Sequence, residues 1–294
     1  MRVARFSLTK TRQLDKLILD YLSGHPALSK FVSVFPSAEN FEEIIARRAF
    51  SAEKRALLKD ILTSQYEQHL TSAVKQNIDA LTDANTYTVT TGHQLCLFSG
   101  PMYFVFKILS TIKLAKKLSD QFPQHHFVPV FWLASEDHDV AEINHTHLFG
   151  KRINWNTTQA GAVGAMNLQG IAEALASFEN ILGNGKAATD VEILKEAYSL
   201  HTLSDATRHL VNALFVKYGL VILDGNDRTL KQSFSGVMKD ELLHGKSAES
   251  IASTSDELKK LGYKTQVNAR EINLFYLSEG NRQRIVKANG KWNV

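Results

Sequence analysis

The sequence of 294 residues predicts an α/β protein built on a parallel β-sheet. A β-rich segment, a long amphipathic helix and a second apolar segment follow one another between residues 86 and 134, which is the order of a βαβ unit with a right-handed crossover. A third apolar segment, residues 218–224, again follows a helical stretch and ends in polar residues. These observations favour one sheet with helices packed on it.

Residues 1–85 predict a helical N-terminal layer that packs on this core. Apolar side chains at helical spacing indicate one helix over residues 10–22. Ser51 is the expected N-cap of a further helix that continues to Tyr66. The polar residues 82–85 end the layer.

The first half of the core is expected over residues 86–150. Its first strand begins at Thr86 and ends at Gly92, and Pro101 opens a helix to about Leu118, because proline is favoured at the first helical position. The apolar run 127–134 predicts a buried strand. That run is too short to cross a bilayer, which needs about 20 residues, so we expect no membrane-spanning segment.

Residues 151–205 predict a helical connecting insertion, with helices near 171–182 and 191–200. The core then continues over residues 206–235, through the third strand. No internal repeat at the periods of solenoid proteins is present.

Residues 236–294 predict a second connecting segment, with a polar stretch at 247–255 and a short helix at 256–261. The segment closes in a small β-meander, for which the expected strands are 265–267, 272–277 and 284–287. Because the chain stops inside this meander, we expect it to be truncated relative to a longer pattern.

The composition is that of an ordinary globular protein, with 44% hydrophobic and 22% charged residues. The formal net charge of +4 comes from interspersed charges, so nucleic acid is not the expected partner. The single cysteine, Cys96, cannot form an intramolecular disulfide, and the first ten residues lack a secretory signal. Both features predict a cytoplasmic protein. Cys96 lies between two leucines, which favours a buried core residue over a nucleophile.

Polar clusters follow all three predicted strands, at residues 91–94, 135–139 and 224–227. In open parallel sheets, ligands bind beyond the carboxyl ends of the strands. We therefore place the functional site at this edge of the sheet.

The first cluster has the features of an anion cradle. Gly92 and Gly100 allow close approach of the backbone, the following helix start offers unpaired N–H groups, and His93 adds a donor. The alternative is a loop whose glycines only permit a tight turn. Lys107 either reaches the anion or is a surface lysine. The binding candidates here are Thr91, Gly92, Gln94, Gly100, Pro101, Tyr103 and Lys107.

The second cluster, Glu136, Asp137, His138 and Asp139, is suited to general acid–base chemistry, because crowded carboxylates beside an imidazole raise the local proton affinity. Metal ligation is an alternative, although no H-E-x-x-H or C-x-x-C spacing is present and no metal is predicted. A solvated helix N-cap is the other. The catalytic candidates are His93, Glu136, Asp137 and His138; Trp132, Asp139, Asn144 and Asp224 complete the substrate-binding candidates.

Nucleotide-binding motifs are absent: there is no G-x-G-x-x-G, and the Gly-Lys-Ser at residues 245–247 lacks the preceding strand and first glycine of a P-loop. Segments 90–107 and 128–139, with Glu142 and Asn144, resemble the bacillithiol biosynthesis cysteine-adding enzyme family, BshC. The similarity extends along the whole chain, and Trp132 followed by Glu-Asp-His-Asp is its most specific part. His93 is a departure, since many relatives carry Gln-Gln after the glycine.

The resemblance implies a Rossmann-like core related to that of class I synthetases. In relatives a C-terminal part completes the sheet and ends in a coiled coil associated with homodimers. The implied reaction adds L-cysteine to glucosaminyl-malate by amide formation. The cofactor is left open, and ATP is suggested by fold analogy alone. A metal-dependent hydrolase or phosphotransferase using Asp137, His138 and Asp139 is one alternative, and a non-catalytic small-molecule-binding protein is another.

Overall fold

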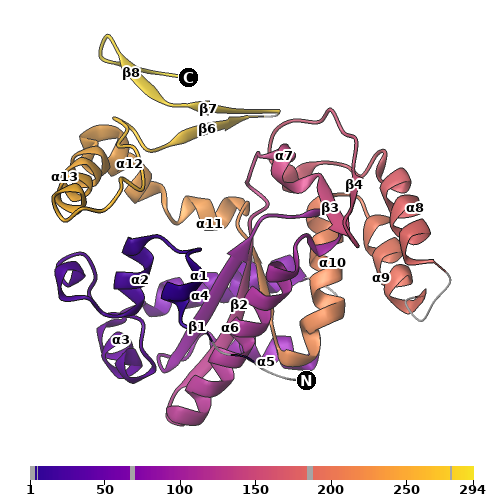
Figure 1. The fold of residues 1–294 in the computed structure, drawn as a ribbon, viewed down its shortest axis with the longest axis horizontal. Coiled ribbons are helices and arrows are strands. Elements are labelled where there is room, and N and C mark those ends of the chain that lie inside the picture. Colours follow the sequence, from indigo (N-terminus) through magenta and orange to yellow (C-terminus); the bar gives the residue numbers. More distant parts are fainter. Residues whose placement is uncertain (1–3, 5, 67–69, 184–187, 279) are drawn as a thin grey trace. The chain divides into compact units, whose positions relative to one another are not determined.

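The computed structural model describes residues 4, 6–66, 70–183, 188–278 and 280–294 (Figure 1). The chain divides into two compact units. The sheet unit comprises Phe50–Ser235 and Tyr276–Gln283; the helical unit comprises Met1–Ala49, Gly236–Phe275 and Arg284–Val294. No helix in the described ranges has both the length and the apolar character needed to traverse a bilayer.

The sheet unit contains three parallel strands, β1 (Thr86–His93), β2 (His126–Leu133) and β5 (Val221–Asp224), in the order β1-β2-β5. This arrangement confirms the predicted parallel α/β core. β2 lies in the middle, which explains why its side chains form an almost unbroken buried run. The third strand is shorter than predicted, because a 3₁₀ turn (Val216–Tyr218) and Gly219, at φ +69°, end the preceding helix first.

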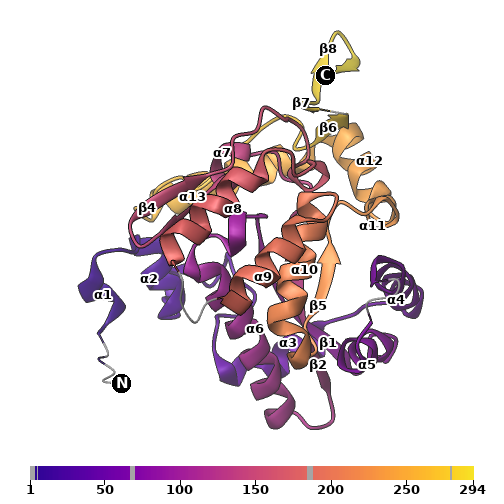
Figure 2. The ribbon, with the colours of Figure 1, turned by 90° about the vertical axis from the view of Figure 1, so that its right-hand side faces the viewer.

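Helices cover both faces of this sheet (Figures 1 and 2). α6 (Met102–Gln121) packs on β1 and β2. Pro101 is its N-cap, so the helix begins one residue after the predicted start. α4 (Ala52–Tyr66) and α5 (Ser72–Ala80) pack against β5 from the other face. α4 begins after Ser51, as predicted. The large side chains buried between these layers include Leu62, Tyr66, Ile78, Phe104, Ile108 and Phe131.

The predicted helical insertion, residues 151–205, contains α8 (Ile171–Leu182) and α9 (Ala188–Tyr198). α10 (Leu203–Phe215) continues from it into the predicted second part of the core. α10 starts with a reciprocal capping box between Thr202 and Asp205. Before these helices lie α7 (Val140–Ile143) and an antiparallel hairpin of β3 (His145–Leu148) and β4 (Lys151–Asn154), which the sequence analysis missed. After β5 comes α11 (Arg228–Gln232).

In the helical unit, the predicted single helix over residues 10–22 is wrong. The structure has α1 (Leu8–Thr11) and α2 (Lys16–Leu22), because Arg12 takes a left-handed φ of 55° through which a helix cannot continue. α3 (Phe41–Arg47) follows.

The prediction of a polar stretch at 247–255 before a short helix is also wrong. α12 (Ser235–His244) is followed by one continuous helix, α13 (Lys246–Lys260). The Ser247 hydroxyl donates to Glu241 at the start of α13, so polar residues there support the helix instead of breaking it. Residues 265–267 form no strand. The remaining strands pair as two short hairpins, β6 (Phe275–Ser278) with β7 (Asn281–Arg284) and β8 (Val286–Ala288) with β9 (Lys291–Asn293).

Candidate active site

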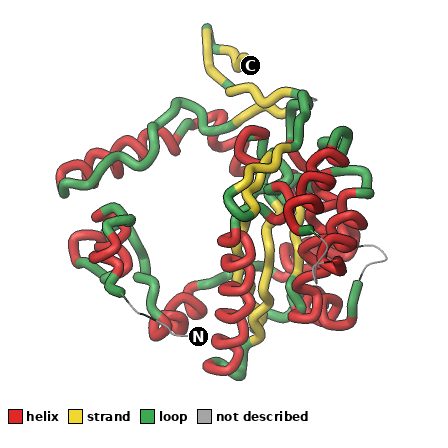
Figure 3. Tube along the Cα trace, turned by 45° about the vertical axis from the view of Figure 1, so that its right-hand side comes forward, coloured by secondary structure: helices red, strands yellow, loops and turns green. Residues whose placement is uncertain are grey.

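The carboxyl ends of the three parallel strands lie level with one another. His93 is paired in register with Leu133, and Leu133 with Asp224. The loops that leave these strand ends therefore gather at one end of the sheet (Figure 3). Side-chain hydrogen bonds join all three: Gln94 reaches Asp137, and Ser135 reaches Asp224.

Gln94 connects the first loop to the acidic cluster. Its Nε2 donates to Asp137 Oδ2 at 2.7 Å and to Glu142 Oε2 at 2.6 Å. Burial alone would raise the pKa of Asp137, but hydrogen bonds from Gln94 and from the backbone N–H groups of His138 and Asp139 outweigh it and hold the pKa below its usual value. Asp137 is therefore an ionised acceptor at neutral pH.

Glu136 and His138 each carry a buried polar atom that lacks a partner among the described residues. Glu136 Oε1 accepts a hydrogen bond from Trp132 Nε1 at 3.3 Å, while Oε2 is buried and unpaired. His138 Nδ1 is likewise buried and unpaired. Burial lowers the pKa of His138. Gly225 closes the pocket around Glu136, since a Cβ at this position would stand 2.6 Å from Oε2.

Asp224 is held by three donors. Its Oδ1 accepts from the Ser135 hydroxyl and from the backbone N–H of Asn226 at 2.8 Å, and its Oδ2 accepts from Ser204 Oγ at 2.8 Å. The carboxylate thus ties together the ends of β2 and β5 and the start of α10. A contact of Asp224 with substrate remains a prediction. Ser135 and Ser204 were missed by sequence reasoning, because an isolated serine carries no signal of a partner far along the chain.

The loop between β1 and α6 is strained. Phe98, Ser99 and Gly100 have φ values of 53°, 65° and 53°, and the first two are not glycine. Phe98 is fixed by Tyr198, whose hydroxyl accepts from the Phe98 N–H at 2.7 Å. Glycine is required at residue 100, because a Cβ there would lie 2.3 Å from the Cβ of Cys96.

This loop borders a cavity of about 550 Å³ at the N-terminus of α6. His93, Gln94, Gly100, Pro101 and Tyr103 line it from the first cluster. The β3 segment and its flanks add Glu142, His145, Thr146, His147 and Leu148, and the remaining lining residues are Cys96, Phe98, Ser99, Met102, Val105 and Phe178. The histidines of β3 were not among the sequence candidates.

His93 is 8% exposed and packs between aromatic rings, with centroids 4.9 Å from Tyr103 and 5.1 Å from Phe104. Its Nδ1 lies 2.9 Å from the carbonyl of Gln94, and its Nε2 is buried with no partner among the described residues. Burial lowers the pKa of His93, so the ring is neutral at pH 7. With Nδ1–H donated to the carbonyl, Nε2 is left as an acceptor.

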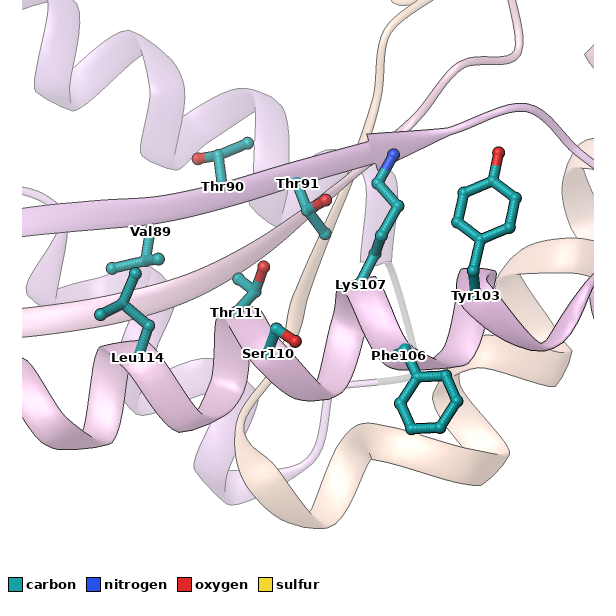
Figure 4. Close-up of a pocket in the computed structure, with 9 residues that line it drawn as sticks. All are labelled: Val89, Thr90, Thr91, Tyr103, Phe106, Lys107, Ser110, Thr111 and Leu114. Atoms are coloured by element: carbon teal, nitrogen blue, oxygen red, sulfur yellow. The ribbon is translucent and has the colours of Figure 1, made fainter. Parts of the chain in front are cut away.

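A second, shallower hollow of about 370 Å³ lies between β1 and α6 (Figure 4). Thr91, Tyr103 and Lys107 line it, together with Phe106 and Leu114 from the same helix. The Lys107 ammonium donates to the carbonyl of Gly92 at the end of β1, so it is tied to the strand. Gly92 itself packs closely, since a Cβ there would lie 3.2 Å from the Cβ of Trp132.

The remaining candidates lie beside the cluster with local roles. Asp139 is the N-cap of α7 and accepts from the Glu142 N–H at 3.3 Å. Asn144 ends α7, and its carbonyl accepts from the Trp155 N–H at 2.7 Å. The N-cap interpretation therefore applies to Asp139 and not to the whole cluster.

Cys96 is buried, as predicted, and burial raises the pKa of its thiol to about 11. A thiol of that pKa is protonated at neutral pH and is a poor nucleophile. Within the described ranges, no group of three or more His, Cys, Asp or Glu side chains has the arrangement of a metal site.

A parallel three-stranded sheet with buried polar side chains at its strand ends defines a Rossmann-like α/β protein. The chain belongs to the BshC family: residues 1–294 match the family model described as "Bacillithiol biosynthesis BshC, N-terminal Rossmann-like domain".

Curated relatives of this chain share the printed name "Putative cysteine ligase BshC". The protein of Flavobacterium psychrophilum is 42% identical over 294 residues, covering 98% of this chain and 55% of the relative. That of Flavobacterium johnsoniae is 43% identical over 285 residues, covering 95% and 54%. That of Bacillus velezensis is 27% identical over 292 residues, covering 94% and 54%. The chain thus spans about half the length of the curated relatives it matches.

Proposed function

We propose that this chain carries the site at which L-cysteine is joined, through its carboxyl group, to the amine of glucosaminyl-malate in bacillithiol biosynthesis. Membership of the BshC family and the ligase name shared by its relatives support this proposal. Within it, the enzyme acts in the cytoplasm, as the cysteine content predicts, and as a homodimer when full length, as the resemblance implies.

The observation that carries the proposal is a set of three buried polar atoms without partners in the described part of the chain: His93 Nε2, Glu136 Oε2 and His138 Nδ1. Leaving such an atom unpaired costs about 1–3 kcal/mol. His93 is the last residue of β1, and Glu136 and His138 follow the end of β2. A ligand rich in N–H and O–H donors would satisfy them, and both the cysteine ammonium and the amino sugar are such ligands.

The charge states of Asp137 and His138 suit them to two different roles. Asp137, ionised at neutral pH, is placed to hold an ammonium group. His138, whose pKa is lowered by burial, is neutral and takes a proton as the sugar amine attacks. The C–N bond forms, the amine proton passes to His138, and the activated carboxyl group of cysteine loses its leaving group. A general base of this kind contributes about 10²–10⁴ in rate.

The cavity at the N-terminus of α6 is the proposed seat of the malate carboxylates. Helix N-termini offer unpaired N–H groups with partial positive charge, which suit a carboxylate or phosphate. Gly100 and Pro101 line this cavity next to the helix start. His93 lines it as well, and its neutral Nε2 is an acceptor that would take a hydrogen bond from a hydroxyl group, not from a carboxylate. A free carboxylate resists attack by an amine, so cysteine must be activated; the resemblance suggests ATP as the activating nucleotide.

The test is formation of bacillithiol from L-cysteine and glucosaminyl-malate, followed by mass spectrometry with and without ATP. We expect His138→Ala and Asp137→Asn to lower turnover by about 10²–10⁴. His209→Ala and Asp120→Asn make the same chemical changes at exposed positions on α10 and α6 and serve as controls. Undiminished turnover in folded His138→Ala and Asp137→Asn proteins would contradict the assignment.

A further inference from the structure

The outer edge of β5 is closed by side chains. β5 pairs with β2 along one edge, and its other edge has no neighbouring strand within the described residues. In a parallel strand, alternate residues direct their backbone groups to opposite sides. Those of Ile222 and Asp224 point away from β2, and each meets a side chain from a helix.

Side chains form the hydrogen bonds that a fourth strand would otherwise make with this edge. Tyr66 Oη accepts from the Ile222 N–H at 2.7 Å, and Arg208 Nη1 donates to the Ile222 carbonyl at 3.3 Å. Gln65 satisfies Asp224 on both sides: its Oε1 accepts from the Asp224 N–H at 2.8 Å, and its Nε2 donates to the Asp224 carbonyl at 3.4 Å. A single primary amide thus fixes the backbone of the residue at which the strand ends.

Arg208 determines which way round the Gln65 amide lies. Its Nη2 donates to Gln65 Oε1 at 3.2 Å, and its guanidinium lies 5.3 Å from the ring centroid of Tyr66. Because a guanidinium only donates, it holds the oxygen of Gln65 toward itself and the NH₂ toward the Asp224 carbonyl.

The position of Asp224 affects the position of the acid–base cluster through one hydrogen bond. Its carboxylate accepts from the Ser135 hydroxyl, and Ser135 immediately precedes Glu136. Ser135 is 2% exposed, so its hydroxyl cannot exchange this partner for water without moving the loop. A shift at the end of β5 therefore moves the start of the loop that carries Asp137 and His138.

We propose that Gln65, oriented by Arg208, is a positioning residue for the acid–base loop. The helical layer before β1 then has a role in the chemistry although none of its side chains is among the predicted site residues. The proposal rests on the proposed function where it concerns catalysis, but the placement of the loop is measurable without any turnover.

The test compares Gln65→Ala with Asn77→Ala. Asn77 is a matched control, because its Nδ2 donates at 2.7 Å to the carbonyl of Gly219, just before β5, without touching Asp224. NMR titration of His138 reports the loop. We expect its pKa to rise toward the ordinary histidine value in Gln65→Ala, since a displaced loop loses the burial that lowers it, and to stay unchanged in Asn77→Ala.

Turnover gives the second readout. We expect kcat to fall about 10- to 100-fold in Gln65→Ala with little change in KM, the signature of misplaced catalytic groups, and to hold in Asn77→Ala. If Gln65→Ala does not fold, Gln65→Glu replaces it: the acceptor for the Asp224 N–H and Arg208 is kept, the donor to the Asp224 carbonyl is lost, and a negative charge is added beside Arg208. The proposal would be overturned if the Gln65 and Asn77 variants had the same kcat and the same His138 pKa. It would also be overturned if the His138 pKa of a folded Gln65 variant equalled that of the wild type. If the His138 pKa shifts in Gln65→Ala but the wild-type protein makes no bacillithiol, the positioning role of Gln65 stands and the proposed function is refuted.

Discussion

Gly164 offers the sharpest test of packing beneath the acid–base loop. It lies in a 3₁₀ turn (Val163–Ala165), and its N–H donates to the Ser135 carbonyl at 2.9 Å. A Cβ at this position would stand 2.4 Å from the Cβ of Ser135 and 2.9 Å from its Cα and carbonyl oxygen. Carbon atoms in contact sit about 3.5–4.0 Å apart, so the backbone must move by about 1 Å.

The expected cost of Gly164→Ala follows from these contacts. Overpacking of this kind costs about 1–3 kcal/mol, and weakening the bond to Ser135 adds about 1 kcal/mol. The reduced freedom of the unfolded chain returns about 0.4–1 kcal/mol, because the φ of Gly164 is not positive. A net loss of about 1–3 kcal/mol lowers the melting temperature by on the order of 2–12 °C.

Differential scanning calorimetry of the purified chain measures this shift. Gly236→Ala is the control: nothing lies within 4 Å of a Cβ there, and the residue is inside helix α12, so we expect a small gain in stability. A Gly164→Ala protein that melts at or above the temperature of the wild type would refute the reasoning.

Further predictions concern Tyr198, Cys96 and Asp79. Tyr198→Phe leaves the Phe98 N–H without its buried acceptor and should cost about 1–3 kcal/mol in urea unfolding; equal stability would contradict the hydrogen bond. Cys96, whose thiol pKa burial raises to about 11, should react with iodoacetamide at pH 8 far more slowly in the native chain than in urea, and equal rates would show that the thiol is accessible. Hydrogen bonds from Lys59 and Lys75 lower the pKa of Asp79 from its ordinary value of 3.8 to about 2. The stabilisation by the ionised carboxylate is therefore complete above pH 3.8 and is lost as pH falls toward 2. The difference in unfolding free energy between wild type and Asp79→Asn should then vanish near pH 2. A difference that persists at that pH would exclude the lysine contacts as its cause.

The sequence was sufficient to predict the sheet because its signal is local. Residues 127–134 form an apolar run of strand length between polar segments, and a buried central strand needs little else. The same locality explains the errors. One left-handed residue, Arg12, divides an otherwise regular helical pattern, and the bond between Ser247 and Glu241 keeps a polar segment helical. Neither is visible in hydrophobic periodicity.

The sequence predicts where the candidate site lies on the sheet, but not which of its side chains form hydrogen bonds with one another. Strand topology alone brings the three polar clusters to one edge. Which side chains pair within them depends on contacts between distant residues: Gln94 lies 43 positions from Asp137, and Gln65 lies 159 positions from Asp224. Such pairs exist only once the layers have packed, so a single sequence carries no periodic signal for them.

The two edge strands of the sheet differ in how many of their outward backbone N–H and C=O groups are occupied by side chains. The margin of β5 has its outward N–H and C=O groups occupied by Tyr66, Arg208 and Gln65. Along β1, side chains take the carbonyls of Thr86 and Gly92, and the alternation of the strand directs the backbone of Thr88 and Thr90, both exposed, the same way. Side chains of α4 and α10 therefore close the β5 margin against edge-to-edge pairing, whereas the exposed Thr88 and Thr90 leave the β1 margin the more open of the two.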